Sequence, residues 1–441
     1  MTPTTSLHVL LHGQPVAQLR AGPAMELRYT PDVVGALGVG ALCLSAALPV
    51  AATPYRDSKP GTAKPRRAVE FWAEGLLPEG ETRTLLERRF DVRRGDTIAL
   101  LAAIGADCAG AVTFVTDTDT GIGIGIGIGS RPPAAGLPKT WNEQPLTEQQ
   151  LSEAVEALPS APLGVGDRVR VSLGGMQAKL LLVRTPRGWT QPLDGQPSTH
   201  ILKPDPKDLV RPGLVAAEAL TLRAAALAGL AAARVELVTV GGRLAVIVER
   251  YDRHRTGDAT VARIHQEDGC QALGLNPAYA KYQQSADAPP SYADLAGLLR
   301  THAVHVDAEL VALGRQMILS WAVGNTDGHA RNVSLLLTDG AARLAPAYDV
   351  APTHLFTTGT DSGLWIDGQP RLQWITRAHV LREMSSWGIE PATARQVLHS
   401  TLTALAEALP RAAAQLGPLL PADLVQQTIA HLQQRAAGPD S

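Results

Sequence analysis

The hydrophobic pattern of this 441-residue sequence changes near Tyr251, and that change constrains the fold more than any other feature. Before it, residues 168–250 consist mainly of short apolar runs separated by turn residues such as Gly241-Gly242, a pattern typical of strands. After it, apolar residues mostly recur with helical spacing. Strands that precede helices, rather than alternating with them, favour an α+β fold over a doubly wound parallel sheet. We therefore expect a strand-rich lobe followed by a helical lobe.

The strand-rich lobe is expected to contain one helix, and the helical lobe one hairpin. Strands are expected at 169–172, 179–184, 199–203, 235–240 and 243–248, and the helix at Val215–Leu230. The later helices are expected at Tyr292–His302, Ala308–Gly324, Arg377–Trp387, Ala392–Leu409 and Ala422–Ala436, with a hairpin at 332–346. Pro410 should end the fourth of these helices, because proline lacks the N–H that a helix interior requires.

A separate small α+β block is expected at residues 1–115. It would contain a hairpin at 6–20, a strand at 25–29, helical segments at 67–94 and 97–104, and a closing strand at 109–114. A low-complexity segment follows, in which Gly and Ile alternate over 121–129. Its glycines are costly to order, and no helix start follows that could present amides to a phosphate, so we expect a linker and not a nucleotide loop. The expected units are thus 1–115, a linker at 116–146, a nucleotide-binding lobe at 147–252 and a helical lobe at 253–441.

Composition excludes several classes of protein. The chain has 40 basic and 42 acidic residues and a formal net charge of −2, so its surface as a whole does not suit nucleic acid or anionic lipid. Cys43, Cys108 and Cys270 are far apart and form no CxxC pair, which disfavours a disulfide framework and fits a reducing cytosol. The first residues lack the basic region of a signal peptide, and glycines interrupt the apolar stretch 33–52. We expect a cytoplasmic protein without a membrane span.

The strongest chemical signal lies in Gly324–Asn332, between the second long helix and the hairpin. Asp327 and Asn332 lie in this segment, and Asp349 follows the hairpin. Phosphoryl transfer needs one acid to orient the attacking hydroxyl, and an Asn with a second acid to hold Mg²⁺ on the nucleotide phosphates. Hard oxygen ligands suit Mg²⁺, which keeps its other positions for phosphate and water. This pattern therefore predicts a phosphoryl-transfer site.

Three upstream features fit the same chemistry. Gly174-Gly175, between two strands, would let backbone amides approach a phosphate, although the Walker A spacing is absent. Lys203 ends an apolar strand and Glu218 lies in the next helix, a pairing that places a lysine on nucleotide phosphates in kinases. Residues 246–251 connect the two lobes and would offer backbone groups to adenine.

Together these features resemble the HipA family of bacterial serine/threonine kinases, the toxin components of HipBA toxin–antitoxin modules. The resemblance spans nearly the whole chain, and its most specific parts are Thr-Asp-Gly-His-x-x-Asn at 326–332 and Gln-Glu-Asp at 266–268. The supporting segments are 71–78, 110–112, 172–179, 200–204, 248–253 and 347–350. The resemblance implies a two-lobed, protein-kinase-like α+β fold with a small N-terminal subdomain.

The resemblance also implies roles for individual residues. Asp327 matches the catalytic proton acceptor, Asn332 and Asp349 match the Mg²⁺ ligands, and Glu218 would support Lys203 as an ion-pair partner. Ser172 matches a loop serine that these kinases autophosphorylate. A phosphate there would add about −1.5 to −2 charge beside the ATP phosphates and switch the enzyme off. The residues that match ATP-binding positions are Gly174, Gly175, Met176, Gln177, Ala178, Lys179, Lys203, Glu249, Arg250, Tyr251, His329, Ala330, Arg331, Asn332, Tyr348 and Asp349.

The activity implied by the resemblance is ATP- and Mg²⁺-dependent phosphorylation of a protein of the translation machinery, such as a tRNA synthetase, by a toxin linked to persistence. The implied partner is a HipB-like DNA-binding antitoxin, through which alone the chain would contact DNA. The sequence departs from the family pattern at Ala178, where an acid is usual, at His265, where an aliphatic residue or proline is usual, and in the Gly-Ile segment. These departures bear on substrate choice and toxicity more than on catalysis.

Two other functions stay open at this point. In the first, the chain acts chiefly as a co-repressor that holds the antitoxin, and catalysis is secondary or lost. In the second, it is a small-molecule kinase on a similar fold. The complete set Lys203, Asp327, Asn332 and Asp349 argues against lost catalysis, and the N-terminal block argues against a small-molecule kinase. A metallophosphoesterase is disfavoured, because the histidines do not stand at the spacing that its metal site needs.

Overall fold

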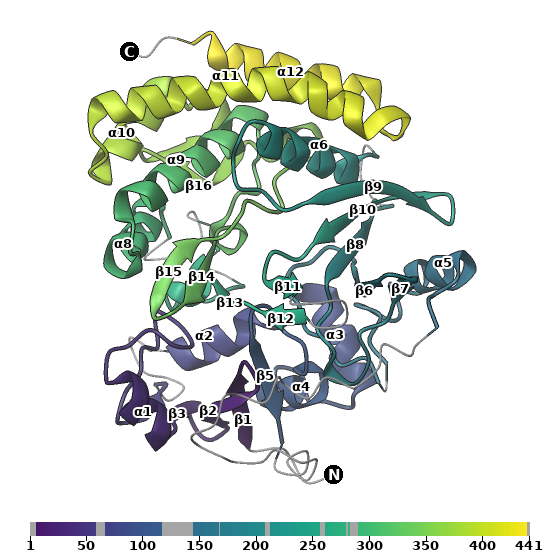
Figure 1. The fold of residues 1–441 in the computed structure, drawn as a ribbon, viewed down its shortest axis with the longest axis vertical. Helices are drawn as coiled ribbons and strands as arrows, with labels where there is room; N and C mark the ends of the chain where they lie inside the picture. Colours follow the sequence, from purple (N-terminus) through teal and green to yellow (C-terminus); the bar gives the residue numbers. More distant parts are fainter. Residues whose placement is uncertain are drawn as a thin grey trace.

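The computed structural model describes residues 6–58, 67–116, 144–166, 168–207, 212–255, 261–278, 281–282 and 290–438. An N-terminal unit, a central sheet and a mainly helical C-terminal part follow one another along the long axis (Figure 1). Most of the expected linker 116–146, including the Gly-Ile segment, lies outside the described residues. The architecture is α+β, as the sequence predicts.

The N-terminal unit is a five-stranded antiparallel sheet with helices packed on it. In the order β4-β3-β2-β1-β5, its strands are β1 (Ser6–Leu11), β2 (Gln14–Arg20), β3 (Glu26–Tyr29), β4 (Tyr55–Arg56) and β5 (Val112–Val115). Its helices are α1 (Pro31–Leu37), α2 (Ala68–Gly75), α3 (Gly80–Arg89) and α4 (Thr97–Ile104). Alternation along β1 turns Leu7 and Val9 inward, where they share a core with Trp72 and Phe114. The sequence did not predict α1, which begins where the Thr30 side chain caps it.

A second antiparallel sheet, in the order β7-β6-β8-β10-β9, forms the strand-rich lobe. Its strands are β6 (Leu180–Thr185), β7 (Gly188–Thr190), β8 (His200–Pro204), β9 (Val235–Val240) and β10 (Arg243–Glu249), and its helices are α5 (Glu148–Glu156) and α6 (Leu214–Leu227). Successive side chains of a strand point to opposite faces. Accordingly, Ala245 and Ile247 of β10 pack with α5, whereas Val246 and Val248 share a core with α6.

The strand expected at 169–172 does not form. Val171 makes one isolated bridge, to Asp107, and both Val169 and Val171 are buried in the core of the N-terminal unit. Both valine side chains therefore pack against apolar residues of the N-terminal unit and not against the central sheet. The segment therefore runs along the N-terminal unit until directly before Gly174.

The C-terminal part combines helices with three small sheets. The helices are α7 (Gly269–Ala272), α8 (Tyr292–His302), α9 (Val306–Val323), α10 (Arg377–Ser386), α11 (Pro391–Leu416) and α12 (Ala422–Ala436). The sheets are β11 (Arg253–Arg255) with β12 (Val261–Arg263), β13 (His265–Asp268) with β14 (Ser334–Thr338) and β15 (Ala341–Leu344), and β16 (Asp361–Ile366) with β17 (Gln369–Arg371). The sequence predicted the β14–β15 hairpin but not the other strands of these sheets.

Helix α11 corrects the expectation that Pro410 ends a helix. The helix continues through Pro410 to Leu416. A proline in a helix interior costs about 3 kcal/mol through a lost hydrogen bond and a steric clash. Leu405, Leu409 and Ala412 are buried on either side of it, and their burial offsets that cost.

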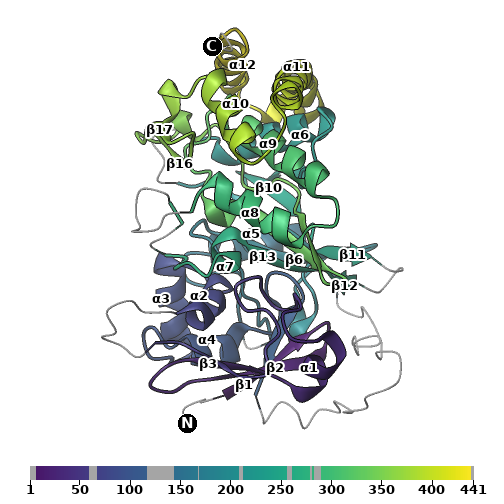
Figure 2. The ribbon, with the colours of Figure 1, turned by 90° about the vertical axis from the view of Figure 1, so that its left-hand side faces the viewer.

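Helix α6 joins the two lobes. It packs against α11, and Leu220 and Ala224 of α6 belong to the same hydrophobic core as Leu398 and Leu402 of α11 (Figure 1). Between the C-terminal part and the N-terminal unit, α7 packs against α2 (Figure 2), and Gln271 donates to the carbonyl of Trp72 at 2.8 Å. Among the described residues, no helix is both long and apolar enough to cross a membrane.

Candidate active site

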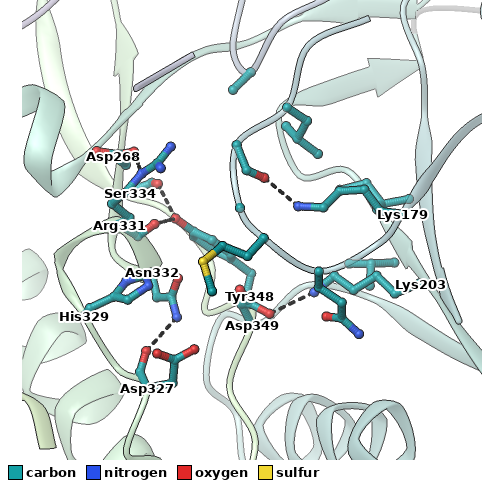
Figure 3. A pocket seen from close by; sticks show the side chains of 18 of the residues that line it. Lys179, Lys203, Asp268, Asp327, His329, Arg331, Asn332, Ser334, Tyr348 and Asp349 are labelled. Atoms are coloured by element: carbon teal, nitrogen blue, oxygen red, sulfur yellow. Dashed lines mark hydrogen bonds and ion pairs between the residues drawn. The ribbon is translucent and has the colours of Figure 1, made fainter. Parts of the chain in front are cut away.

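A pocket of about 460 Å³ lies where the three parts of the chain meet. Figure 3 shows Lys179 and Lys203 across from Asp327 and Asn332, with Asp349 between them. The N-terminal unit contributes Gly75, Glu79 and Ala109 to the wall. The predicted site residues that line the pocket are Gly174, Gly175, Met176, Gln177, Lys179, Lys203, Glu218, Glu249, Arg250, Tyr251, Asp327, His329, Arg331, Asn332, Tyr348 and Asp349.

Three charged side chains form the centre of the pocket. Lys203 Nζ lies 2.8 Å from Glu218 Oε1 and 2.8 Å from Asp349 Oδ1. Lys203 comes from β8, Glu218 from α6, and Asp349 follows β15. The side chains of Lys203 and Glu218 are 9% and 5% exposed, whereas that of Asp349 is 45% exposed. Asp349 therefore presents its carboxylate to the open side of the pocket.

Burial and neighbouring charges act against each other in this cluster. For Asp349, burial opposes ionisation, but the cations of Lys203 and Lys179 lower the pKa to about 2. For Lys203, burial is outweighed by Asp349 and Glu218, which raise the pKa above its usual value. For Lys179, burial and the charge of Lys203 lower the pKa to about 8. Two lysines beside one half-exposed carboxylate suit a pocket that receives a polyanion.

The loop 172–179 closes the pocket on one side. Lys179 Nζ donates to Gly174 O at 2.5 Å (Figure 3). Gly175 has a φ of +99°, which other residues rarely adopt. A Cβ atom on Gly174 would lie 2.3 Å from Nη2 of Arg331, so a larger residue there would displace either the loop or that guanidinium.

The catalytic-loop candidates follow the end of α9. Gly324 ends this helix with a φ of +82°, which turns the chain toward the pocket. Asp327 N donates to Asn325 Oδ1 at 3.0 Å, and Asn332 Nδ2 donates to Asp327 O at 2.9 Å. The Asp327 carboxylate accepts a hydrogen bond from the Tyr282 hydroxyl. These bonds hold Asp327 and Asn332 as one rigid turn.

Asn332 and Asp349 offer oxygen ligands for a metal. Asn332 uses its amide nitrogen in the bond to Asp327, so its amide oxygen is left for a cation. Nowhere in the described ranges do three or more His, Cys, Asp or Glu side chains group as a metal site. One carboxylate and one amide oxygen nevertheless fit Mg²⁺, which in nucleotide sites takes its other ligands from phosphates and water.

Some predicted site residues lie outside the pocket or turn away from it. Ser172 is completely buried and donates from Oγ to Leu76 O at 2.7 Å. Ala178 is exposed and does not line the pocket, and Ala330 belongs to the hydrophobic core. Arg250 lines the pocket, but its guanidinium lies 2.8 Å from Asp252 in a buried ion cluster. The Arg250 N–H and carbonyl are also engaged within the protein.

Among the polar lining residues that the sequence did not assign to the site are Glu79, Asp268, Lys281 and Tyr282. Asp268 could have been predicted, because it is the last residue of the Gln-Glu-Asp motif. Its Oδ2 lies 2.9 Å from Arg331 Nε. The other three stand in no sequence pattern that indicates phosphoryl transfer.

This fold and this pocket define a two-lobed, protein-kinase-like protein with an additional N-terminal unit. A family model described as the HipA-like C-terminal domain matches residues 171–409, and one described as the HipA N-terminal domain matches residues 7–115. The chain belongs to the HipA family of kinases, which confirms the resemblance found in its motifs.

Individual relatives agree with this assignment. The putative kinase Y4mE of Sinorhizobium fredii is 36% identical over 314 residues, which cover 71% of this chain and 69% of the relative. The serine/threonine-protein kinase toxin HipA of Shewanella oneidensis is 28% identical over 364 residues, covering 80% of this chain and 78% of the relative. A solved structure of HipA, HipB and operator DNA from Shewanella oneidensis matches 98% of this chain and 96% of that chain, with a TM-score of 0.77 and 24% identity. That match shows a shared fold.

Proposed function

We propose that this chain is an ATP- and Mg²⁺-dependent serine/threonine protein kinase that acts as a HipA-like toxin on a protein of the translation machinery. One observation carries the proposal: Lys203, Asp327, Asn332 and Asp349 line a single pocket. They are the parts that phosphoryl transfer to a hydroxyl needs. Membership of a kinase family supports the same conclusion.

In this proposal both lobes bind the nucleotide. Lys203, fixed by Glu218, and Lys179 face the phosphates, and the glycine pair lets loop amides approach them. The base lies toward Glu249 and Tyr251 of the connector. The rings of Tyr251 and Tyr348 have centroids 5.4 Å apart and supply aromatic surface to this pocket.

The transfer step places Asp327 against the acceptor hydroxyl. Its carboxylate orients the Ser or Thr oxygen and takes the proton as that oxygen attacks the γ-phosphorus, and the bond to the ADP oxygen breaks. Lys203 offsets charge on the phosphates throughout. Mg²⁺ held by Asn332 and Asp349 would neutralise phosphate charge when bound.

Autophosphorylation on Ser172 is part of the proposal, and the structure sets a condition for it. Because Ser172 is buried and its hydroxyl is bonded to Leu76 O, the segment must first leave the N-terminal unit. A phosphate of about −1.5 to −2 charge could not return to that buried place. Phosphorylation would therefore hold the loop 172–179 away from the nucleotide and stop the enzyme.

We also propose a HipB-like DNA-binding antitoxin as partner, with DNA contacted only through it. The support is the HipA of the matching structure, which is in a complex with HipB and its operator DNA. A chain that served only as a co-repressor would not need a lysine paired with both Glu218 and Asp349 beside Asp327. We therefore favour catalysis over the co-repressor function.

The direct test uses purified protein with labelled ATP and Mg²⁺. The variants are Asp327→Asn, Ser172→Ala and the control Asp339→Asn, which makes the same change on the exposed β14–β15 turn. We expect labelled wild type and Asp339→Asn, and no label in Asp327→Asn. Ser172→Ala should label an added protein but not itself. A wild type that neither binds ATP nor becomes labelled overturns the proposal.

The cellular part needs a separate experiment. Expression in a bacterium should arrest growth for wild type and not for Asp327→Asn, and newly phosphorylated proteins should include translation factors. Growth arrest that persists in Asp327→Asn would exclude a toxin that acts by phosphorylation.

A further inference from the structure

Glu79 reaches the pocket from the N-terminal unit, at the turn between α2 and α3. Its side chain is 15% exposed. Glu79 Oε2 lies 2.9 Å from Lys281 Nζ, and Oε1 pairs with Arg331. Both partners belong to the C-terminal part, with side chains 8% and 6% exposed. One acid of the N-terminal unit thus binds two nearly buried cations of another unit.

Arg331 connects Glu79 to the loop 172–179, which is the phosphate loop of the proposed function. Its Nε donates to Asp268 Oδ2 at 2.9 Å and its Nη2 to Gly75 O at 2.7 Å, while Nη1 donates to Glu79. The same Nη2 is the atom that a Cβ on Gly174 would meet at 2.3 Å. Arg331 is therefore the surface on which the phosphate loop rests, and Glu79 and Gly75 fix that surface from the N-terminal unit.

Lys281 connects Glu79 to residues 325–332, which form the catalytic loop of the proposed function. The carbonyl of Lys281 accepts a hydrogen bond from Ala330 N at 3.1 Å. Its neighbour Tyr282 donates to the carboxylate of Asp327, and Lys281 Nζ lies 5.5 Å from the centroid of the Tyr282 ring. A displaced Lys281 would move both the backbone of the catalytic loop and the hydroxyl on Asp327.

The cations of the pocket favour an acid at this position. Arg331 and Lys281 share a pocket with Lys179 and Lys203, and burial leaves little water to screen four cations from one another. Burial opposes ionisation of Glu79, but attraction to Arg331 and Lys281 lowers its pKa below the usual value. The side chain is therefore an anion at neutral pH.

We propose that Glu79 is a positioning residue for phosphoryl transfer, acting through Arg331 and Lys281 to set the phosphate loop against the catalytic loop. This inference rests on the proposed function, because it concerns the rate of that transfer. It makes the N-terminal unit a part of the catalytic apparatus.

The test measures single-turnover transfer of labelled phosphate from ATP and Mg²⁺, to the full-length chain itself and to casein. Glu79→Gln keeps the shape and removes the charge. The matched control is Glu74→Gln in the same unit, where Glu74 is 19% exposed and pairs with Arg83 at 3.2 Å. We expect the rate at saturating ATP to fall between about tenfold and about a hundredfold in Glu79→Gln only. The ATP concentration at half-saturation should change less than the rate, because Lys203 stays in place.

Two further measurements separate positioning from folding. The melting temperatures of Glu79→Gln and Glu74→Gln should fall by similar amounts, while only the former loses rate. The double variant Lys281→Met with Glu79→Gln should be no slower than the slower single variant. Both changes remove the same ion pair, between Glu79 and Lys281. Equal rates in Glu79→Gln and wild type, or additive losses in the double variant, overturn the inference. A wild type without any transfer overturns the proposed function instead.

Discussion

The hydroxyl of Tyr282 donates a hydrogen bond to Oδ1 of Asp327 at 2.5 Å. In the proposed function, the acceptor hydroxyl must reach this same carboxylate. The Tyr282 ring makes an edge contact with the His329 ring, with 5.0 Å between the centroids. This contact holds the Tyr282 hydroxyl at the Asp327 carboxylate. If Asp327 is the proton acceptor that we propose, Tyr282 occupies the position of the acceptor hydroxyl.

Replacing Tyr282 by Phe should free that position. A hydrogen bond to a charged group contributes about 1.5–3 kcal/mol, so we expect the KM for an added acceptor protein to fall about tenfold or more in Tyr282→Phe. The control is Tyr55→Phe, which removes a hydroxyl bonded to Pro49 O in the N-terminal unit. A lower kcat with unchanged KM would instead mean that Tyr282 orients Asp327.

Replacing Lys203 by Met should separate nucleotide binding from the rest of the fold. The change leaves Glu218 and Asp349 without their shared cation, at a cost of about 3 kcal/mol in the free energy of unfolding. It should also abolish the rise in melting temperature that ATP and Mg²⁺ produce. Lys207→Met, at an exposed position after β8, is the control and should keep that rise. A full ATP-induced rise in Lys203→Met would contradict the proposed phosphate contact.

Adding one methyl group at Gly174 should weaken ATP binding. The new Cβ would stand 2.3 Å from Arg331 Nη2, so either the loop or the guanidinium must move. We expect the ATP concentration at half-saturation in Gly174→Ala to rise about tenfold, with little change in melting temperature. Gly35→Ala on α1, where a Cβ meets nothing within 4 Å, should bind ATP as wild type does.

Glu267, the middle residue of the Gln-Glu-Asp motif, predicts a pH dependence of stability. Burial raises its pKa to about 8, although the bond from Ala46 N favours the charged form. The folded state therefore keeps a proton that the unfolded state releases near its ordinary pKa of 4.5. Stability from this group is fully present below pH 4.5 and is lost as the pH rises to about 8.

The isosteric variant Glu267→Gln isolates this effect. Urea unfolding from pH 5 to pH 9 should show wild type losing stability relative to Glu267→Gln as the pH rises. Glu153→Gln, an exposed change on α5, should run parallel to wild type. A constant difference between wild type and Glu267→Gln across this range would contradict a buried, protonated carboxyl.

The sequence predicted the site residues that lie close together in the chain or on consecutive helices and strands. Asp327 and Asn332 share one turn, and Asp349 follows the next hairpin, so their spacing alone indicates a common pocket. Lys203 and Glu218 were predictable for a similar reason, because one strand and the next helix carry them.

The remainder depends on tertiary packing that spacing does not encode. Glu79 meets Lys281 only because α2 packs on α7, and nothing near either residue indicates this. The direction of the Arg250 side chain depends on Asp107 and Asp252, which form a buried ion cluster with it. Pro410 illustrates the same limit in the fold, since the burial of neighbouring side chains overrides a local helix-breaking signal.

The shared core of α6 and α11 restricts how this enzyme can take up and release nucleotide. A clamshell motion between the lobes would pull Leu220 and Ala224 away from the helix they pack against and expose apolar surface to water. We therefore expect exchange to proceed through the loop 172–179. This loop is held by the bonds of Ser172 to Leu76 O and Asp107 O, by the bond of Lys179 to Gly174 O, and by the close approach of Gly174 to Arg331. In such a frame, we expect the rate of turnover to depend on how readily this one short loop undocks.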